Sequence, residues 1–147
     1  MKLPRGITGF FDEKAALQMI DLKKFRSLCY DVSLHEDIVL ISIKEAVYPT
    51  NYICAKFSVN DQPIQILLNA YYPLLAAAVI TEHEHIVFCE LPKTFESFIA
   101  HYQSISLEEL QEKLREEHLE QLSEVERQQI TFWAPQNVGE IIFNTWD

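Results

Sequence analysis

The fold of this chain is decided by residues 52–68, which read YICAKFSVNDQPIQILL. Successive side chains of a β-strand point to opposite faces, and residues 52–59 divide in this way. One face carries Ile53, Ala55, Phe57 and Val59, and the other carries Tyr52, Cys54, Lys56 and Ser58. Residues 60–63, Asn-Asp-Gln-Pro, are typical of a turn, and the alternation resumes at Ile64, Ile66 and Leu68. The stretch therefore predicts a β-hairpin.

Further strand-like segments lie on both sides of this hairpin. Residues 38–43 form a run rich in β-branched side chains, and residues 76–81 and 86–91 are apolar segments separated by the polar residues 82–85. These connections are too short for the crossovers that parallel strands require. We therefore expect an antiparallel meander of four or five strands.

Segments with helical periodicity precede and follow the predicted sheet in the sequence. Asp21 is a candidate N-cap for a helix over residues 21–32, and this helix could begin as early as Glu13. A second helix is expected over residues 94–102. The pattern predicts an α+β fold, with helices packed mainly on one face of the sheet, in a single domain over residues 1–147.

The C-terminal third of the chain combines glutamate-rich and apolar sequence. Ser106-Leu107-Glu108-Glu109 matches a capping box, and the leucine stripe that follows changes phase near His118, which indicates a break or bend. Residues 138–147 are apolar to the end, so we expect this tail to dock against the core. Trp133 and Phe143 are expected to close the ends of that core.

Composition indicates an ordinary globular domain. The chain has 147 residues, of which 48% are hydrophobic and 23% charged. Its three cysteines are widely spaced in apolar sequence, a pattern typical of buried free thiols in a reducing cytosol. No targeting segment is visible, and the longest apolar stretch, residues 71–80, is too short to span a bilayer. We therefore expect a cytoplasmic protein without a membrane partner.

The negative charge is unevenly distributed. The net charge is −10, yet residues 1–30 carry six Lys or Arg against three Asp or Glu. Residues 104–127 hold eight Glu and three Lys or Arg. Such a surface repels phosphate backbones, which disfavours nucleic acid, and attracts a basic protein. The alternative is a solvated helix face without a partner.

Few residues are arranged as a chemical site would require. His83-x-His85 is the one spacing that suggests a metal, because two such imidazoles share a strand face, but the sequence indicates no third ligand. An exposed polar turn explains the pair as well, so we expect neither a metal nor a cofactor. The apolar neighbours of the cysteines favour inert thiols over a nucleophile. Glu90 is a candidate for burial beside a Lys or a backbone amide.

Two functional interpretations follow. The first is a non-enzymatic protein-binding module, in one version an acidic inhibitor or immunity-type protein that masks a basic partner. Its contacts would come from acidic and aromatic side chains: Glu109, Glu112, Glu116, Glu120, Tyr102 and Trp133. The alternative is a small enzyme or ligand-binding protein, whose pocket would be lined by Tyr71, Tyr72, His83, His85 and Trp133.

Overall fold

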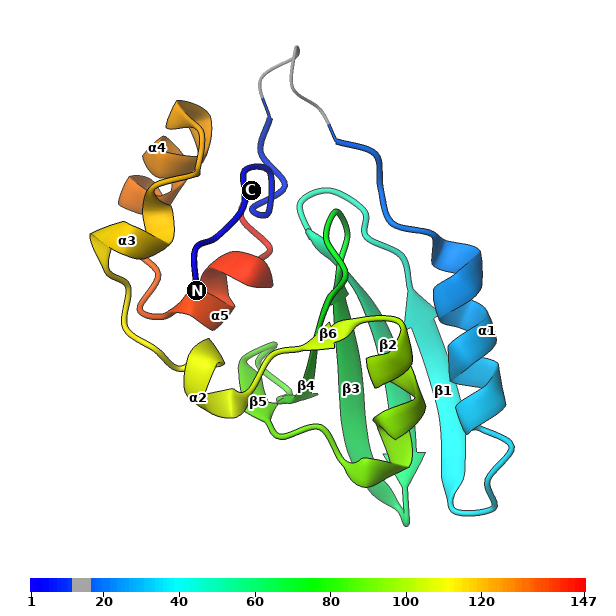
Figure 1. Ribbon diagram of the computed structural model, residues 1–147. Coiled ribbons are helices and arrows are strands. Elements are labelled where there is room, and N and C mark those ends of the chain that lie inside the picture. Colours follow the sequence, from blue (N-terminus) through cyan, green and yellow to red (C-terminus); the bar gives the residue numbers. More distant parts are fainter. Residues whose placement is uncertain (12–16) are drawn as a thin grey trace.

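The computed structural model describes residues 1–11 and 17–147 (Figure 1). Five antiparallel strands follow one another across a sheet in the order β1-β2-β3-β4-β5. They are β1 (Ile38–Lys44), β2 (Tyr52–Val59), β3 (Gln62–Asn69), β4 (Leu74–Ile80) and β5 (Ile86–Cys89). A short strand, β6 (Gln103–Ser104), pairs with β4 in parallel. The predicted α+β class and antiparallel meander are confirmed.

The β2–β3 hairpin turns in two residues. Val59 pairs with Gln62, which leaves Asn60 and Asp61 in the turn with φ angles of 51° and 66°. Positive φ at both central positions matches the twist of the flanking strands, and Asn and Asp tolerate this conformation well. The turn fixes the register, and the register fixes which side chains face each side of the sheet.

One face of the sheet is covered by α1 (Leu22–Val32) and η1 (Lys93–Ala100). Phe25, Phe95 and Phe98 pack there against strand residues such as Phe57 and Ile66. The predicted N-cap is confirmed, since the Asp21 carboxylate accepts hydrogen bonds from the backbone N–H groups at positions 23 and 24. Glu13, the earliest start considered for this helix, lies outside the described residues.

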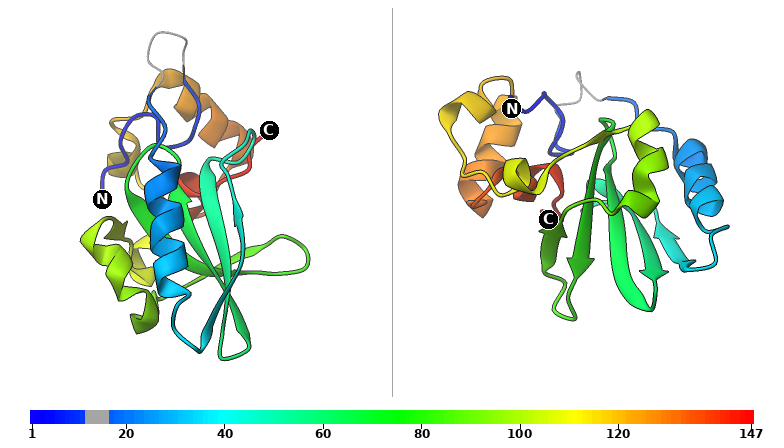
Figure 2. Two further views of the ribbon diagram at one scale, coloured as in Figure 1. Left: turned by 90° about the vertical axis from the view of Figure 1, so that its right-hand side faces the viewer. Right: turned by 60° about the horizontal axis from the view of Figure 1, so that its bottom comes forward.

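The opposite face is covered by the C-terminal elements, chiefly α2 (Leu107–Leu110) and α5 (Val138–Ile142). Leu67 and Ala76 of the sheet pack there with Leu110, Ile141 and Phe143. Helices therefore lie on both faces of the sheet, whereas they were expected mainly on one face (Figure 2). The physical reason is that β3 and β4 are apolar at successive positions, as strands buried on both sides are.

The glutamate-rich stretch folds as several short helices. The helices α3 (Glu116–Leu119) and α4 (Glu124–Trp133) follow α2. The Ser106 hydroxyl accepts a hydrogen bond from the Glu109 N–H at 3.2 Å, so the predicted cap is confirmed. The helix expected over residues 94–102 is the 3₁₀ helix η1, with a kink at Phe95. None of the described helices is long and apolar enough to cross a membrane.

Three buried asparagines fasten the two ends of the chain to the sheet. The side-chain NH₂ groups of Asn51 and Asn69 both donate to the carbonyls of Ile7 and Ile142. The Asn144 side chain donates to the Thr8 carbonyl, and its backbone N–H donates to the Asn51 side chain at 2.7 Å. The N-terminal segment and the docked tail are thereby joined through one polar cluster.

Candidate functional site

A cleft of about 650 Å³ opens between the sheet and the C-terminal tail. Its floor includes Tyr52, Cys54 and Phe88 from the strands. One wall is the β4–β5 hairpin, and the other runs from the end of α4 through α5 to the tail. The side chains that line these walls include Glu84, His85, Trp133, Asn137, Glu140, Phe143 and Trp146. A cleft of this size lies in the range of ligand and peptide sites.

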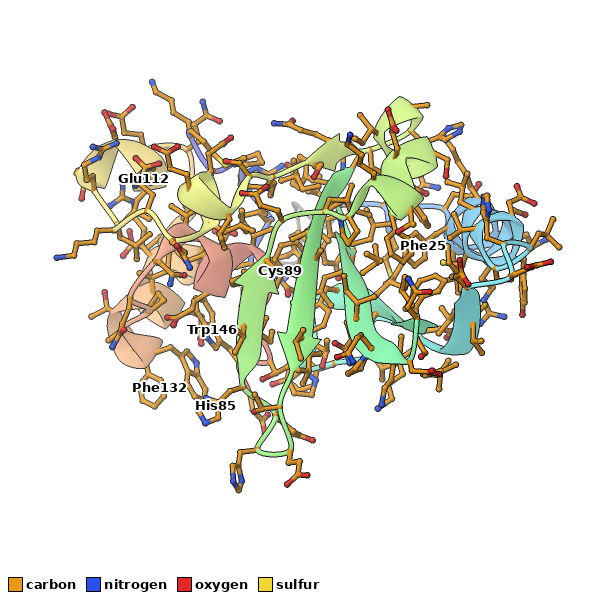
Figure 3. All side chains as sticks on the ribbon, turned by 90° about the horizontal axis from the view of Figure 1, so that it is seen from below. Phe25, His85, Cys89, Glu112, Phe132 and Trp146 are labelled. Carbon is orange, nitrogen blue, oxygen red and sulfur yellow. The ribbon has the colours of Figure 1, made fainter. Side chains whose placement is uncertain are left out.

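An aromatic ladder borders the cleft. Phe132 is 77% exposed and meets Trp133 edge to face, with ring centroids 5.4 Å apart. Trp133 stacks on Trp146 at 6.4 Å with an angle of 3° between the rings, and Trp146 also contacts Phe10. Figure 3 shows Phe132 projecting from the molecule near the same edge as His85. We call Phe132, Trp133 and Trp146 the aromatic edge.

The end of α4 explains why Phe132 and Trp133 project. Ala134 follows the helix in the left-handed conformation, with φ of 48°, and its N–H donates to the Ile130 carbonyl. This C-cap ends the helix sharply and directs the chain toward α5. Trp133 is 38% exposed, so the expectation that it seals the core is wrong, whereas Phe143 and Trp146 are buried.

The titratable groups on the cleft floor are neutral at physiological pH. Burial raises the pKa of the Cys54 thiol to about 11 and that of the Tyr52 hydroxyl to about 12. A thiol with such a pKa is almost wholly protonated near pH 7, so Cys54 is a poor nucleophile. The floor of the cleft is therefore uncharged.

The charged lining of the cleft is mainly acidic. It comprises three carboxylates, from Glu45, Glu84 and Glu140, and one ammonium group, from Lys44. The Glu45 carboxylate also pairs with Arg26 on α1 at 3.2 Å. This lining suits a cationic partner better than an anionic one.

The residues predicted to line one pocket lie at opposite ends of strand β4. His85 and Trp133 line the cleft, whereas Tyr71, Tyr72 and His83 are not among its lining residues. Tyr71 and Tyr72 precede β4, and the two histidines follow it, so a seven-residue strand separates them. Tyr71 packs edge to face on Phe11, and the Tyr72 hydroxyl donates to the Arg5 carbonyl. These tyrosines hold the N-terminal segment.

Metal-binding groups do not converge in the described part of the chain. No cluster of three or more His, Cys, Asp or Glu side chains there could hold an ion. His83 and His85 lie exposed on the hairpin. Glu90 is also exposed, and its carboxylate accepts a hydrogen bond from the Leu107 N–H at 3.1 Å.

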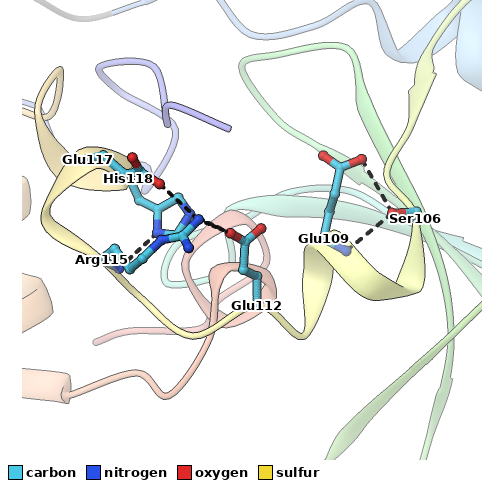
Figure 4. A network of polar contacts seen from close by, with 6 residues as sticks. All are labelled: Ser106, Glu109, Glu112, Arg115, Glu117 and His118. Carbon is cyan, nitrogen blue, oxygen red and sulfur yellow. Dashed lines mark hydrogen bonds and ion pairs between the residues drawn. The ribbon is translucent and has the colours of Figure 1, made fainter.

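Most of the acidic side chains expected to bind a partner form hydrogen bonds or ion pairs with residues of the same chain (Figure 4). Glu109 caps α2 together with Ser106, and Glu112 pairs with Arg115. Glu112 also lies 3.4 Å from the Nε2 atom of His118, which is fully buried. Two further carboxylates form ion pairs, Glu116 with Arg127 at 2.9 Å and Glu120 with Lys2 at 3.0 Å. Glu116 and Glu120 remain exposed and still contribute charge to this surface.

Tyr102 lies in the core and cannot serve as an exposed anchor. Its side chain is 5% exposed and packs edge to face on Phe25, with centroids 6.1 Å apart. Burial raises the pKa of Tyr102 to about 12. Tyr102 lies two residues beyond the end of η1, and its side chain packs in the same buried cluster as Phe95 and Phe98.

Two residues important to this region escaped the sequence analysis. Phe132 belongs to an aromatic pair whose exposure depends on where α4 ends. Glu126 was counted with the surface glutamates but is fully buried. Ser123-x-x-Glu126 is a capping-box pattern, and it could have indicated that Glu126 faces the helix N-terminus.

Comparison with protein-family models, curated proteins and solved structures found no match to this chain.

Proposed function

We propose that this chain is a non-enzymatic module that binds a basic protein, with the aromatic edge as its anchor. The observation that carries the proposal is the exposure of Phe132 on a rigid support of two stacked indoles. Aromatic side chains dominate the energetics of many protein interfaces, and a rigid ring loses little conformational entropy on binding.

Charge supports a basic partner. The cleft beside the aromatic edge has three carboxylates and one ammonium group, and the whole chain has a net charge of −10. Long-range attraction between opposite charges speeds association, while buried aromatic contacts slow dissociation. In this proposal Glu116 and Glu120 steer the partner, and the aromatic edge holds it. An inhibitor or immunity-type protein that masks a basic active site would have these properties.

The second candidate function is the binding of a small ligand in the cleft, and the volume of the cleft favours this role. At about 650 Å³ with an uncharged floor, the cleft could accommodate a small molecule. The neutral Cys54 and Tyr52 provide no activated nucleophile or base, so binding is better supported than catalysis. A ligand that fills the cleft would touch Cys54, whereas a protein on the aromatic edge would touch Phe132.

The proposal is tested by affinity capture from native cytosol with three baits: the wild type, Phe132→Ser and Ile99→Ser. Ile99 is 53% exposed on η1, which covers the other face of the sheet, so it is a matched control. We expect the wild type and Ile99→Ser to capture the same basic protein at low salt, and Phe132→Ser to lose it. A protein captured equally by all three baits would contradict the proposal.

A further inference from the structure

Strand β1 is an open edge of the sheet. It pairs with β2 on one side, and no other described strand pairs with it. Half of the backbone N–H and C=O groups of such a strand point away from the sheet and can pair with another chain. A bulge at Ile41 and the charge of Lys44 limit unspecific pairing here, so a partner strand would need a matching surface.

Apolar side chains gather along this edge. Among the described residues, six of the twelve exposed large hydrophobic side chains lie between residues 30 and 48. Leu34 is 83% exposed and Ile41 is 52% exposed. Val39 and Ile41 lie on β1 itself, and exposed apolar side chains on an edge strand favour pairing with another strand. The edge therefore has the composition of an interface.

A hollow of about 230 Å³ lies between α1 and the outer part of β1. It is lined by Arg26 and Tyr30 of the helix and by residues 40–43 of the strand. The Nε atom of Arg26 is buried there and has no hydrogen-bond partner in the described part of the chain. An unpaired buried donor of this kind costs stability. Figure 2, left, shows α1 and β1 side by side on this side of the molecule.

The charges along α1 identify a second copy of this chain as the occupant. The helix carries Lys23, Lys24 and Arg26 in its first half, and Asp31, Glu36 and Asp37 follow in its second half and the next loop. Residues 21–45 carry four Lys or Arg against five Asp or Glu, so this surface is much closer to neutral than a chain with net charge −10. Under a two-fold axis, antiparallel pairing of two β1 strands places the basic half of one helix near the acidic half of the other.

We propose that two copies pair through their β1 edges and so join their sheets into one continuous sheet. This proposal does not depend on the function proposed above, since it uses the open edge of β1, and of this strand only its last residue, Lys44, lines the cleft. Each copy would place its Ile41 beside the hollow of the other. The surface is self-complementary, as a two-fold interface requires.

Sedimentation equilibrium over a wide range of concentration tests the pairing. The wild type should move from one chain, 17.2 kDa, toward two as its concentration rises. Ile41→Lys would bury an unpaired charge in the interface and should raise the dissociation constant about tenfold or more. Val79→Lys, at an exposed valine of β4 that does not line the cleft, is the matched control and should associate as the wild type does. A wild type that stays monomeric, or an Ile41→Lys variant that pairs normally, would overturn the proposal.

A charge exchange tests the two-fold arrangement. One variant carries Lys23→Glu and Lys24→Glu, and the other carries Glu36→Lys and Asp37→Lys. Each alone should associate more weakly than the wild type, because like charges then face each other across the axis. An equal mixture should regain association as a heterodimer. Failure of the mixture to associate better than either variant alone would exclude the antiparallel arrangement.

Discussion

The carboxylate of Glu126 is fully buried where the N-terminal segment passes α4. It accepts hydrogen bonds from the backbone N–H groups of Gly6, Thr8 and Ser123 and from the hydroxyls of Thr8 and Ser123. All five groups are donors, which suits an ionised carboxylate that can only accept. A single side chain therefore caps α4 and fastens the first residues of the chain.

Replacing this carboxylate should be costly. In Glu126→Gln an NH₂ group faces donors that it cannot satisfy, so the free energy of unfolding should fall by about 2–4 kcal/mol. Urea denaturation measures the loss. Glu124→Gln is the matched control, because Glu124 is exposed in the same helical turn and should change stability by less than about 0.5 kcal/mol. Equal midpoints for the two variants would refute the role given to Glu126.

The buried Cys29 thiol and the buried Tyr102 hydroxyl predict that the protein becomes less stable at alkaline pH. Burial raises the pKa of Cys29 from 9.0 to about 12, and that of Tyr102 from 10.0 to about 12. Well below pH 9 both groups are protonated in the folded and the unfolded chain. As the pH rises from 9 toward 12 the unfolded chain releases these protons first, so the free energy of unfolding decreases. Urea midpoints between pH 7 and pH 11 should fall accordingly.

Tyr102→Phe provides the control for this pH effect. The Tyr102 hydroxyl is buried without a hydrogen-bond partner among the described residues. Removing it should leave the stability at pH 7 equal or slightly higher. The variant should also lose less stability in alkali than the wild type. A marked loss of stability at pH 7 would show that the hydroxyl has a partner in solution.

At the scale of elements, strands could be predicted better than helices. The alternation from Tyr52 to Val59 and the Asn60-Asp61 turn are local signals, and each predicted strand is present. The helices after Pro92 are short, and their ends depend on caps and tertiary contacts, so periodicity alone gave neither their ends nor the 3₁₀ form of η1. The apolar tail was predicted to dock, but two of the asparagines that hold it, Asn51 and Asn69, come from distant segments of the chain.

The docked tail should be essential for stability. Deleting residues 139–147 removes the buried side chains of Ile141, Ile142, Phe143 and Trp146. Burial of each is worth about 1.5–3 kcal/mol, so the truncated chain should lose several kcal/mol and melt at a much lower temperature. Asn144→Ala should reproduce part of this loss, and Thr145→Ala, at an exposed neighbour, should not. A truncation with the melting temperature of the wild type would contradict the docking.

At the scale of the whole molecule, the cleft could not be predicted because it is assembled from separate segments. Strands β1, β2, β4 and β5 contribute to it together with the end of α4, α5 and the tail. Sequence patterns identified His85 and Trp133 but could not separate them from Tyr71 and Tyr72, which lie at the other end of β4. Distances across a sheet depend on register and on layer packing, and neither is a local property.

The acidic surface near α3 should raise the rate at which a basic partner associates with this chain. Glu116→Gln with Glu120→Gln removes two exposed ion pairs, each worth about 0–1 kcal/mol, so the fold should persist. The rate of association with a captured partner should fall about two- to tenfold at low salt and much less at high salt. Asp61→Asn with Glu96→Gln removes the same charge at other exposed positions. If this control pair slows association equally, net charge alone would explain the effect.

The central claim is that a protein partner binds at the aromatic edge and the cleft beside it. Hydrogen–deuterium exchange of the chain, alone and with its captured partner, tests this most directly. We predict slower exchange in residues 83–88 and 132–146, and unchanged exchange in α1 and η1, which lie on the other face of the sheet. Protection confined to α1 and η1, with none at residues 132–146, would contradict the account.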